Sequence, residues 1–362
     1  MARLTSLDAF RGFTIAAMVL VNNPGDWGNL YSQLAHAEWN GWTFTDWIFP
    51  FFLFIGGVAM ALSLGRLAAA GADKPALLRK LSLRAALIFA IGFLLNFYPN
   101  FDLAHVRIPG VLQRIALCTL LAAPVVVYCN WRQQLGVILA LFTLYSVLML
   151  GVDVPGSGRA VLLPGQDFGA WLDRQLLGGH LWAKAKTWDP EGLVSTLPAV
   201  GSQLFGVLCG QWLLSPRPRA EHAVWMLLVG LLGVWLGNVL DVVLMPINKS
   251  LWTPSYAVFT AGWAAVLFAA FYWLLDGVRD PIAVRWCQPF VIYGMNALFI
   301  FAFSGFLVKT LSKLGLTSML YAPIRALPIG PVNTSLLYAL CFNAVMFSIA
   351  WMMWRRQWFI KV

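Results

Sequence analysis

The sequence has 362 residues, of which 60% are hydrophobic and only 11% are charged, and its mean hydropathy is +0.74. This composition excludes an ordinary water-soluble domain and predicts an integral membrane protein. The formal net charge is +10. We attribute it to basic residues on one side of a membrane and expect no nucleic-acid binding.

Long apolar runs recur along the chain, and a helix needs roughly 20 mostly apolar residues to cross a bilayer. The runs are too long for barrel strands, and lipid-exposed backbone must satisfy its own hydrogen bonds, so we expect helices. The predicted fold is all-α, a polytopic membrane bundle of about ten transmembrane helices forming a single domain over residues 1–362. The runs are Phe13–Val21, Ile48–Leu64, Ala85–Leu95, Val111–Tyr128, Leu135–Leu150, Leu193–Leu214, Ala223–Leu244, Tyr256–Leu275, Phe290–Val308 and Leu336–Trp354.

Basic residues orient these predicted spans. If the spans alternate in direction, most Lys and Arg residues fall on one side, which the positive-inside rule assigns to the cytoplasm. Both termini are then cytoplasmic, and two longer segments, 151–192 and 309–334, face outward. The basic residues on the cytoplasmic side are Arg3, Arg66, Lys74, Arg79, Lys80, Arg84, Arg132, Arg217, Arg219, Arg279, Arg285, Arg355, Arg356 and Lys361.

The stretch LAHAEWNGWTFTDWIFPFFLF places His36 shortly before the second apolar run. An imidazole there can take a proton from an attacking group or attack an acyl group itself. Asn22 ends the first run and Asp46 begins the second, and both can orient the ring or polarise a carbonyl. Purely structural roles stay open for two of these residues: His36 as an interfacial residue among tryptophans, and Asp46 as a helix cap.

The motif RIPGVLQR places Arg107 and Arg114 at the start of the fourth run. Arg114 lies about five residues beyond Pro109, roughly 7–8 Å along a helix axis. A guanidinium at this depth usually faces the bundle interior and binds a carboxylate or an anionic ligand. Arg107 lies at the outer edge. A functional role and a purely structural one, in which its side chain reaches back to the membrane interface, are equally compatible with this position.

Other polar residues lie near the predicted membrane surfaces. Asp189 and Glu191 precede the sixth run, where they either bind a cationic amine or interact with the helix dipole. Asn296 lies inside the ninth run, where its amide needs a partner. Arg11 and Arg84 either hold a phosphate or anchor helices on the cytoplasmic side. The remaining candidates, all on the outer side, are Asn248, Lys249, Trp252 and Ser255.

Two kinds of motif are missing from the sequence. The five cysteines show no C-x-x-C or Cys/His spacing, so we expect neither a metal site nor a disulfide. The sequence contains no Walker phosphate-binding loop and no dinucleotide-binding glycine motif. ATP-driven transport and hydride transfer are therefore not indicated.

Several motifs, in the same order, resemble one family of membrane enzymes. From Leu7 to the C-terminus they are SLDAFRGFTIAAMVLVNN, HAEWNGWTFTDWIFPFFLF, RIPGVLQR, DPEGLVSTLP, PINKSLWTPSY, YGMNALFIF and WRRQWFIKV. Together they resemble the membrane domain of heparan-α-glucosaminide N-acetyltransferase and its bacterial NagX-like relatives. The N-terminal luminal segment and first span of the lysosomal member have no counterpart here, and we expect a whole catalytic domain without them.

This resemblance implies acetyl transfer across a membrane, from cytosolic acetyl-CoA to the amine of a glucosamine-type sugar on the luminal or periplasmic side. It implies that His36 is the active histidine, that Asn22 belongs to the same site, and that Arg107 and Arg114 are functional. It also implies a homodimer. The loop between Asn22 and His36 is longer than in the lysosomal member, and segment 151–192 differs, so the acceptor amino sugar stays open.

We therefore expect an acetyl-CoA-dependent amino-sugar N-acetyltransferase of the bacterial inner membrane. Arginines would bind the donor phosphates, and the pantetheine arm would pass between helices, with its thioester near Asn22 or Asn296. His36 would either deprotonate the acceptor amine or carry the acetyl group. The arginines proposed for the phosphates are Arg11, Arg84 and Arg114.

Two alternatives from other functional classes remain. The first is a secondary transporter of amino sugars in which the same residues bind substrate or protons. Such transporters often contain inverted repeats, and none is visible in this sequence. The second is a membrane scaffold whose polar residues only join helices.

Overall fold

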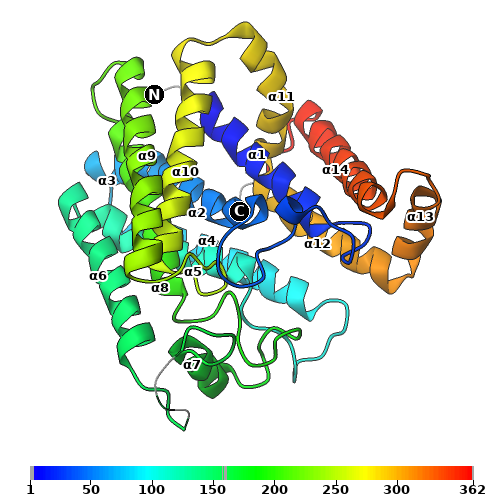
Figure 1. Ribbon diagram of the computed structural model, residues 1–362. Coiled ribbons are helices and arrows are strands. Elements are labelled where there is room, and N and C mark those ends of the chain that lie inside the picture. The colour runs from blue at the N-terminus through cyan, green and yellow to red at the C-terminus, as the bar shows by residue number, and fades with distance from the viewer. Residues whose placement is uncertain (1–3, 157, 159–160, 361–362) are drawn as a thin grey trace. The chain divides into compact units, whose positions relative to one another are not determined.

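The computed structural model of the chain describes residues 4–156, 158 and 161–360 (Figure 1). Arg3 and Lys361, two of the basic residues that orient the predicted spans, lie outside the described residues. Within these ranges the chain is helical and contains no β-strand, which confirms the all-α prediction.

Each predicted apolar run lies largely on a helix. The ninth run lies on two helices, and the second and eighth each continue into a π-helical turn, Ala61–Gly65 and Trp273–Gly277. The helices are α1 (Thr5–Asn22), α2 (Phe44–Met60), α3 (Arg66–Ala69), α4 (Lys74–Phe97), α5 (Val111–Tyr128), α6 (Trp131–Gly151), α7 (Phe168–Leu177), α8 (Thr196–Leu213), α9 (Arg219–Val243), α10 (Pro254–Tyr272), α11 (Pro281–Met295), α12 (Ala297–Lys313), α13 (Leu316–Arg325) and α14 (Pro331–Arg355).

Among the described residues, six helical segments are long and apolar enough to cross a membrane, and the bent pair of α11 and α12 would make seven. This finding supports a membrane protein. The count of about ten spans and the cytoplasmic location of both termini stay predictions. The six segments are Phe44–Ala69, Val111–Tyr128, Trp131–Gly151, Arg219–Val243, Pro254–Gly277 and Pro331–Arg355.

The ninth apolar run, expected to form one helix, is broken at Asn296. Helices α11 and α12 meet there at 73°. The side-chain nitrogen of Asn296 donates to the carbonyl of Trp358 at 2.9 Å, and its oxygen accepts from the backbone nitrogen of Ile360 at 3.0 Å. The polar groups of Asn296 are thus satisfied by the C-terminal segment, which allows a break inside an apolar sequence.

The two segments predicted as outward loops contain helices of their own. Segment 151–192 contains α7, whose first turn is capped by Asp167, since its carboxylate accepts from the backbone nitrogen of Ala170 at 2.9 Å. Segment 309–334 contains the end of α12, all of α13 and the first residues of α14. Local capping, rather than a long apolar run, accounts for α7.

The chain divides into two compact units. Unit 1 comprises Met1–Glu38, Trp42–Phe52 and Leu267–Val362, and unit 2 comprises Trp39–Gly41 and Leu53–Val266.

In unit 1, helices α1 and α11 cross in direct backbone contact. Glycine is needed at both crossing points: a Cβ atom on Gly12 would lie 1.7 Å from the carbonyl oxygen of Phe290, and one on Gly294 would lie 1.9 Å from that of Asp8. Beside this crossing, the ring of Phe10 lies 5.6 Å from that of Phe51. Aromatic packing and glycine contacts together hold α1 within its unit.

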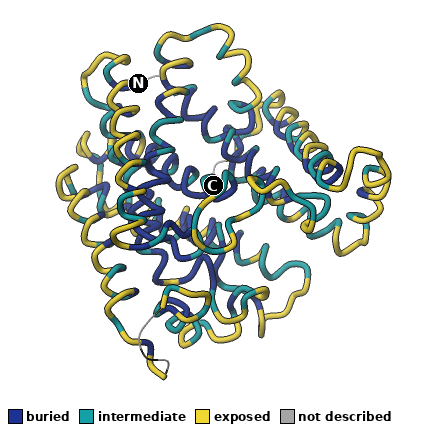
Figure 2. Tube along the Cα trace, viewed as in Figure 1, coloured by how far each residue is buried: buried dark blue, intermediate teal, exposed yellow. Residues whose placement is uncertain are grey.

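Unit 2 is also built on close helix crossings. A Cβ atom on Gly57 of α2 would lie 1.9 Å from the carbonyl oxygen of Gln203, and one on Gly206 of α8 would lie 1.9 Å from that of Phe54. Helices α9 and α10 run side by side in Figure 1. They approach closely at Gly237, where an added Cβ atom would lie 2.6 Å from the Cα atom of Phe259. Figure 2 shows exposed residues along the outer sides of α6 and α9, as expected of lipid-facing helices.

We predict that Gly12→Ala destabilises unit 1 by about 3 kcal/mol or more, because a methyl group has no space beside the Phe290 carbonyl and α1 must move. Thermal unfolding of the purified protein in detergent measures this effect. Gly305→Ala in α12 is the control, since a Cβ atom there meets nothing within 4 Å. Equal melting temperatures for the two variants would contradict the observed crossing.

Candidate active site

His36 and Asp46, both in unit 1, form a direct pair. The ring nitrogen Nδ1 of His36 lies 2.6 Å from Oδ1 of Asp46. The Asp46 side chain is fully buried, whereas half of the His36 side chain is exposed. The carboxylate therefore binds the ring at Nδ1, and half of the histidine side chain stays exposed.

The second oxygen of Asp46 is occupied by backbone and hydroxyl donors. Its Oδ2 atom accepts from the backbone nitrogens of Ala37 at 3.1 Å and Thr43 at 3.0 Å, and the Thr43 hydroxyl lies 3.1 Å away. Because the carboxylate acts as an acceptor in these bonds, the bond to His36 calls for a proton on Nδ1. The remaining nitrogen, Nε2, then carries a lone pair.

The two interpretations of Asp46 as a helix cap and as a partner of His36 prove compatible. Helix α2 begins at Phe44, so Asp46 lies in its first turn and reaches back to the backbone nitrogen of Thr43, as the third residue of a capping box does. The same carboxylate binds His36 through its other oxygen. Helix capping thus fixes the position of the histidine partner.

The loop that carries His36 is clamped to the start of α2. The side-chain oxygen of Gln33 accepts from the backbone nitrogen of Phe44 at 3.0 Å, and the backbone carbonyl of Gln33 accepts from the Thr45 hydroxyl at 3.1 Å. The Thr43 hydroxyl donates to the carbonyl of Ala35 at 2.6 Å. Sequence reasoning missed Gln33 and Thr43, although a Thr three residues before an acidic residue is a recognisable cap signal.

The other predicted residues of unit 1 make different contacts. Asn22 is the exposed last residue of α1, and the structure shows no hydrogen bond from it to His36 within the described residues. Arg11 places Nη1 3.5 Å from Oδ1 of Asp8 and 3.5 Å from the carbonyl of Gly294. The roles predicted for Asn22 and Arg11 stay predictions.

In unit 2, Arg107 binds two carboxylates. Its Nε donates to Asp189 at 2.8 Å, and its Nη2 donates to Asp189 at 2.6 Å and to Glu191 at 2.5 Å. The Nζ of Lys249 lies 3.9 Å from Oε1 of Glu191. Two positive and two negative side chains thus form a balanced cluster, and the carboxylates are already paired before any cationic amine arrives.

Protonation equilibria agree with this pairing. Burial by itself would raise the pKa of Glu191, but the charges of Lys249, Arg107 and Arg114 lower it to about 2. Burial would likewise lower the pKa of Arg107, and the bonds to Asp189 and Glu191 instead raise it above its usual value. The ion pairs therefore persist across the physiological pH range.

Arg114 is fully buried and bound by backbone carbonyls and one hydroxyl. Its Nη1 donates to the carbonyl of Pro190 at 3.0 Å and its Nη2 to that of Gly192 at 2.9 Å, and Nη2 also donates to the Ser195 hydroxyl. The guanidinium carbon lies 5.2 Å from the centre of the Trp252 ring. Arg114 therefore holds the segment between α7 and α8 in place.

Three other residues of unit 2 were predicted from the sequence: Asn248, Ser255 and Arg84. Asn248 donates to the side chain of Asn40 at 3.1 Å and accepts from the backbone nitrogen of Leu251 at 2.9 Å. The Ser255 hydroxyl lies 3.0 Å from that of Thr253. Both Asn248 and Ser255 are fully buried. Arg84 is exposed on α4.

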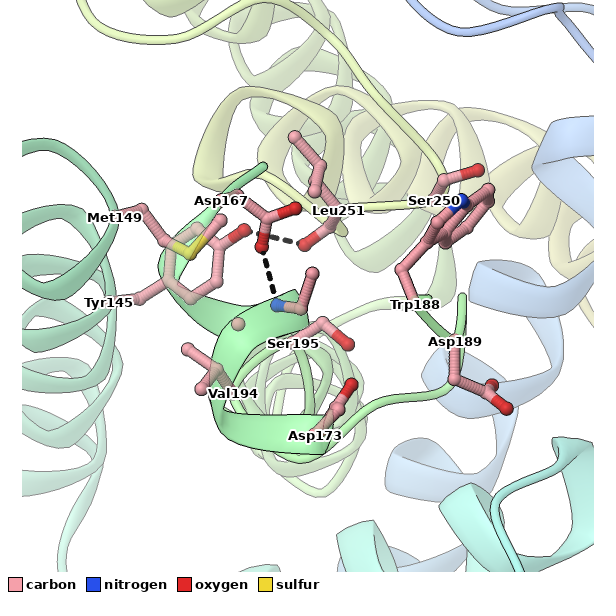
Figure 3. A pocket seen from close by; sticks show the side chains of 12 residues that line it. Tyr145, Met149, Asp167, Asp173, Trp188, Asp189, Val194, Ser195, Ser250 and Leu251 are labelled. Carbon is pink, nitrogen blue, oxygen red and sulfur yellow. Dashed lines mark hydrogen bonds between the residues drawn. The ribbon is translucent and has the colours of Figure 1, made fainter. Parts of the chain in front are cut away.

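A small pocket in unit 2 lies beside the segment that Arg114 holds (Figure 3). Asp167, Asp173, Asp189 and Ser195 line its polar side, and Tyr145, which donates to the carbonyl of Leu251 at 2.6 Å, also lines it. Its volume of about 20 Å³ admits a water molecule but no sugar. Among the described residues, no group of three His, Cys, Asp or Glu side chains is placed to hold a metal ion.

Asp173, which sequence reasoning missed, is a buried carboxylate that lines this pocket. Its Oδ1 accepts from the backbone nitrogen of Leu193 at 2.9 Å, and no ion pair to it occurs in the described part of the chain. Burial raises the pKa of Asp173 to about 6, and the hydrogen bond from Leu193 offsets only part of this shift. No spacing in the sequence marks Asp173, because its partners come from the chain beyond α7.

We predict that Arg114→Met lowers stability by about 3 kcal/mol or more, because carbonyl groups of the segment between α7 and α8 lose their donors in a buried place. Thermal unfolding and limited proteolysis of the segment measure the effect. Arg132→Met is the control, since Arg132 also lies over a tryptophan ring, at 5.2 Å, but is exposed. A similar loss of stability in both variants would show that Arg114 does not hold the segment between α7 and α8.

We predict that Asp173→Asn weakens the pH dependence of stability. With a pKa of about 6 in the folded protein against an ordinary value of 3.8, folding favours the protonated form. The stabilisation is therefore fully present below about pH 4 and is lost as the pH rises through about 6, by up to about 3 kcal/mol. Asparagine does not ionise. The melting temperature of the variant should therefore fall less than that of the unmodified protein as the pH rises from about 4 to about 6.

Asp153→Asn is the control for this measurement, since Asp153 is an exposed carboxylate in the same predicted outward segment. Its pH dependence should match that of the unmodified protein. If Asp173→Asn matches the unmodified protein as well, the buried carboxylate does not govern this part of the pH profile.

Comparisons with known proteins identify the family. The family model described as "Heparan-alpha-glucosaminide N-acetyltransferase, catalytic" matches residues 3–236. The heparan-alpha-glucosaminide N-acetyltransferase of Homo sapiens is 31% identical over 355 residues, covering 83% of this chain and 52% of the human protein. The Mus musculus protein of the same name is 30% identical over 355 residues, covering 83% of this chain and 53% of the mouse protein.

This chain thus spans about half the length of the curated relatives that it matches. The matched region includes the His36–Asp46 pair and, of the charged cluster, Arg107, Asp189 and Glu191. The family resemblance drawn from the sequence motifs is confirmed: the chain belongs to the heparan-alpha-glucosaminide N-acetyltransferase family.

Proposed function

We propose that this chain is a transmembrane N-acetyltransferase. It would move an acetyl group from acetyl-CoA on the cytoplasmic side to the amine of a glucosamine-type sugar on the periplasmic side. The pair of His36 and Asp46 carries this proposal, because a buried carboxylate orients a half-exposed imidazole. Family membership and the name of the relatives support the reaction class.

The geometry of the pair supports a defined proton route. The Nδ1–H group of His36 donates a hydrogen bond to Asp46 and keeps its proton, which leaves the Nε2 lone pair to take a proton from the acceptor amine. The amine nitrogen forms a bond to the acetyl carbonyl carbon as the carbon–sulfur bond breaks. The departing CoA thiolate then takes a proton from Nε2, which returns His36 to its starting state.

A two-step route uses the same atoms. The Nε2 atom of His36 would attack the thioester first, releasing CoA and forming an acetyl-imidazole, and the acceptor amine would then take the acetyl group from the ring. Asp46 would stabilise the positive charge that develops on the ring in both routes. The contacts of the pair are compatible with either order of events.

For the donor, we propose Arg11 and Arg84 as phosphate ligands. Both belong to the side of the chain that basic residues assign to the cytoplasm. Arg107 and Arg114 are engaged by carboxylates and carbonyls, and both polar atoms of Asn296 bind the C-terminal segment. We therefore assign these three residues to positioning rather than to direct donor contact.

For the acceptor, the balanced cluster of unit 2 supports recognition of a polar sugar over capture of an ammonium group. Asp189 and Glu191 share Arg107, and Lys249 lies 3.9 Å from Glu191, which leaves donor capacity on Lys249 for sugar hydroxyl groups. Trp252, with its nitrogen bonded to Ser202 at 3.1 Å, is buried beneath Arg114 and would act by supporting that residue.

We further propose that the protein is a multi-pass component of a bacterial inner membrane, that it functions as a homodimer, and that residues 1–362 form one catalytic domain. The apolar helices and family membership support the membrane location. The dimer and the bacterial membrane follow from the resemblance.

We predict that His36→Ala lowers the rate of acetyl transfer by about 10² to 10⁴-fold, because the proton acceptor is lost. Asp46→Asn should also lower the rate, because the ring of His36 loses the carboxylate that orients it. Release of CoA from acetyl-CoA with glucosamine-type acceptors, measured on purified protein in detergent, reports these rates. Melting temperatures show whether each variant is folded.

His105→Ala is the matched control. His105 also pairs with an aspartate, with Nδ1 2.8 Å from Asp102, but this pair is exposed. Its removal should leave the rate unchanged. CoA release that is equal in the unmodified protein and His36→Ala would overturn the proposal, and uptake of labelled sugar into proteoliposomes without any acyl donor would favour a transporter instead.

A further inference from the structure

Gln203 on α8 is a buried amide with an unused acceptor. Only 2% of the residue is exposed, and its Oε1 atom has no hydrogen-bond partner among the described residues. Its Nε2 atom donates to the Thr119 hydroxyl of α5 over 3.4 Å, a long bond. An unsatisfied amide oxygen in an apolar bundle is costly, so this position calls for a partner that the chain itself does not supply.

Open space lies next to this amide. A Cβ atom on Gly56 of α2 would meet one atom within 4 Å, the Nε2 of Gln203 at 3.7 Å. The neighbouring Gly57 behaves differently, because a Cβ atom there would lie 1.9 Å from the backbone oxygen of Gln203. Gly57 is therefore required by the helix crossing, whereas Gly56 leaves room beside the side chain of Gln203.

All three residues belong to unit 2 and lie near the middle of their helices. Gly56 is in the centre of the candidate span Phe44–Ala69, Thr119 is in the centre of α5, and Gln203 is in the centre of α8. At this depth neither water nor lipid supplies hydrogen bonds freely. The three residues thus form a polar site in the apolar interior of the bundle.

The hydrogen-bonding capacity of the site matches a secondary amide. Gln203 offers an acceptor through Oε1, and it offers a donor through the second hydrogen of Nε2. A ligand amide can donate its N–H to the first and accept through its carbonyl from the second. Apolar surroundings on the remaining sides favour methylene groups on both sides of such an amide.

We propose that Gln203, Thr119 and Gly56 form a subsite that binds one amide of the pantetheine arm of the acyl donor. This inference rests on the proposed function, in which the arm passes between helices to reach the outer side. Gln203 binds the amide, Thr119 fixes the orientation of Gln203, and the missing side chain at Gly56 leaves space for the chain of the ligand. The nucleotide end of the donor lies outside this subsite.

The test is the binding of CoA to the full chain in detergent, measured by calorimetry for the unmodified protein and for Gln203→Leu, Thr119→Val and Gly56→Ala. We expect Gln203→Leu to weaken CoA binding about tenfold, the equivalent of a lost hydrogen bond. Gly56→Ala should weaken binding by narrowing the space. Adenosine 3′,5′-bisphosphate, which lacks the arm, should bind all variants as it binds the unmodified protein.

Two control variants separate ligand binding from folding. Gln134→Leu replaces another buried amide whose Oε1 is without a partner in the described residues, but whose Nε2 binds the carbonyl of Cys129 near the start of α6. Gly136→Ala adds a methyl group where nothing lies within 4 Å. Both should bind CoA normally. Gln203→Leu should melt no lower than the unmodified protein, because it removes an unsatisfied polar group.

The outcomes separate this inference from the proposed function. If the unmodified protein binds CoA and Gln203→Leu binds it equally well, the subsite is wrong while the proposed function stands. If Gln203→Leu weakens CoA and adenosine 3′,5′-bisphosphate alike, the subsite is again wrong, because the change acts on the whole site. If the unmodified protein binds no CoA, both the subsite and the proposed donor are overturned.

Discussion

A polar group buried in an apolar helical bundle needs a hydrogen-bond partner, and this constraint accounts for several contacts between distant segments in both units. Arg114 organises the segment between α7 and α8 because its guanidinium needs acceptors, and the carbonyls of Pro190 and Gly192 supply them. Asn296 binds the C-terminal segment for the same reason. In each case hydrogen bonds to a distant segment offset the cost of burying the polar group, and the same bonds fix the position of that segment.

The same constraint shapes the site that we propose for catalysis. Asp46 is fully buried, and its two oxygens receive donors from the loop carrying His36 and from Thr43, the residue before α2. The carboxylate therefore serves the helix and the histidine at once. Because the carboxylate that caps α2 also binds the ring, the imidazole has a defined orientation. General-base chemistry requires such an orientation.

In the charged cluster of unit 2, the pairing of charges bears on the role that we propose for it. Arg107 neutralises Asp189 and Glu191, and Lys249 lies close to Glu191. A site with balanced charge would suit a polar sugar bound through hydrogen bonds, whereas an unpaired carboxylate pair would favour any cation. Specificity for an amino sugar would then come from geometry around the acceptor, and the reactive amine would have to be uncharged when it attacks.

The sequence alone determined the helical class, the positions of the apolar runs, the family and the identity of His36 and Asp46 as candidates. Helical runs in a membrane protein are encoded locally, since each span must satisfy its own backbone. A cap such as Asp46 is likewise a short-range signal. These features depend on residues that are close in the chain, so they can be read without a structure.

Only the tertiary structure decided what the other polar residues touch. Arg107 meets Asp189 across 82 positions of sequence, and Asn296 meets the backbone of Trp358 across 62. The break at Asn296, the pocket beside Asp173 and the unused oxygen of Gln203 likewise arise from segments that are far apart in the chain. The physical reason is that a buried polar group is satisfied by whichever segment the packing of the helices brings to it, and composition or spacing does not encode that packing.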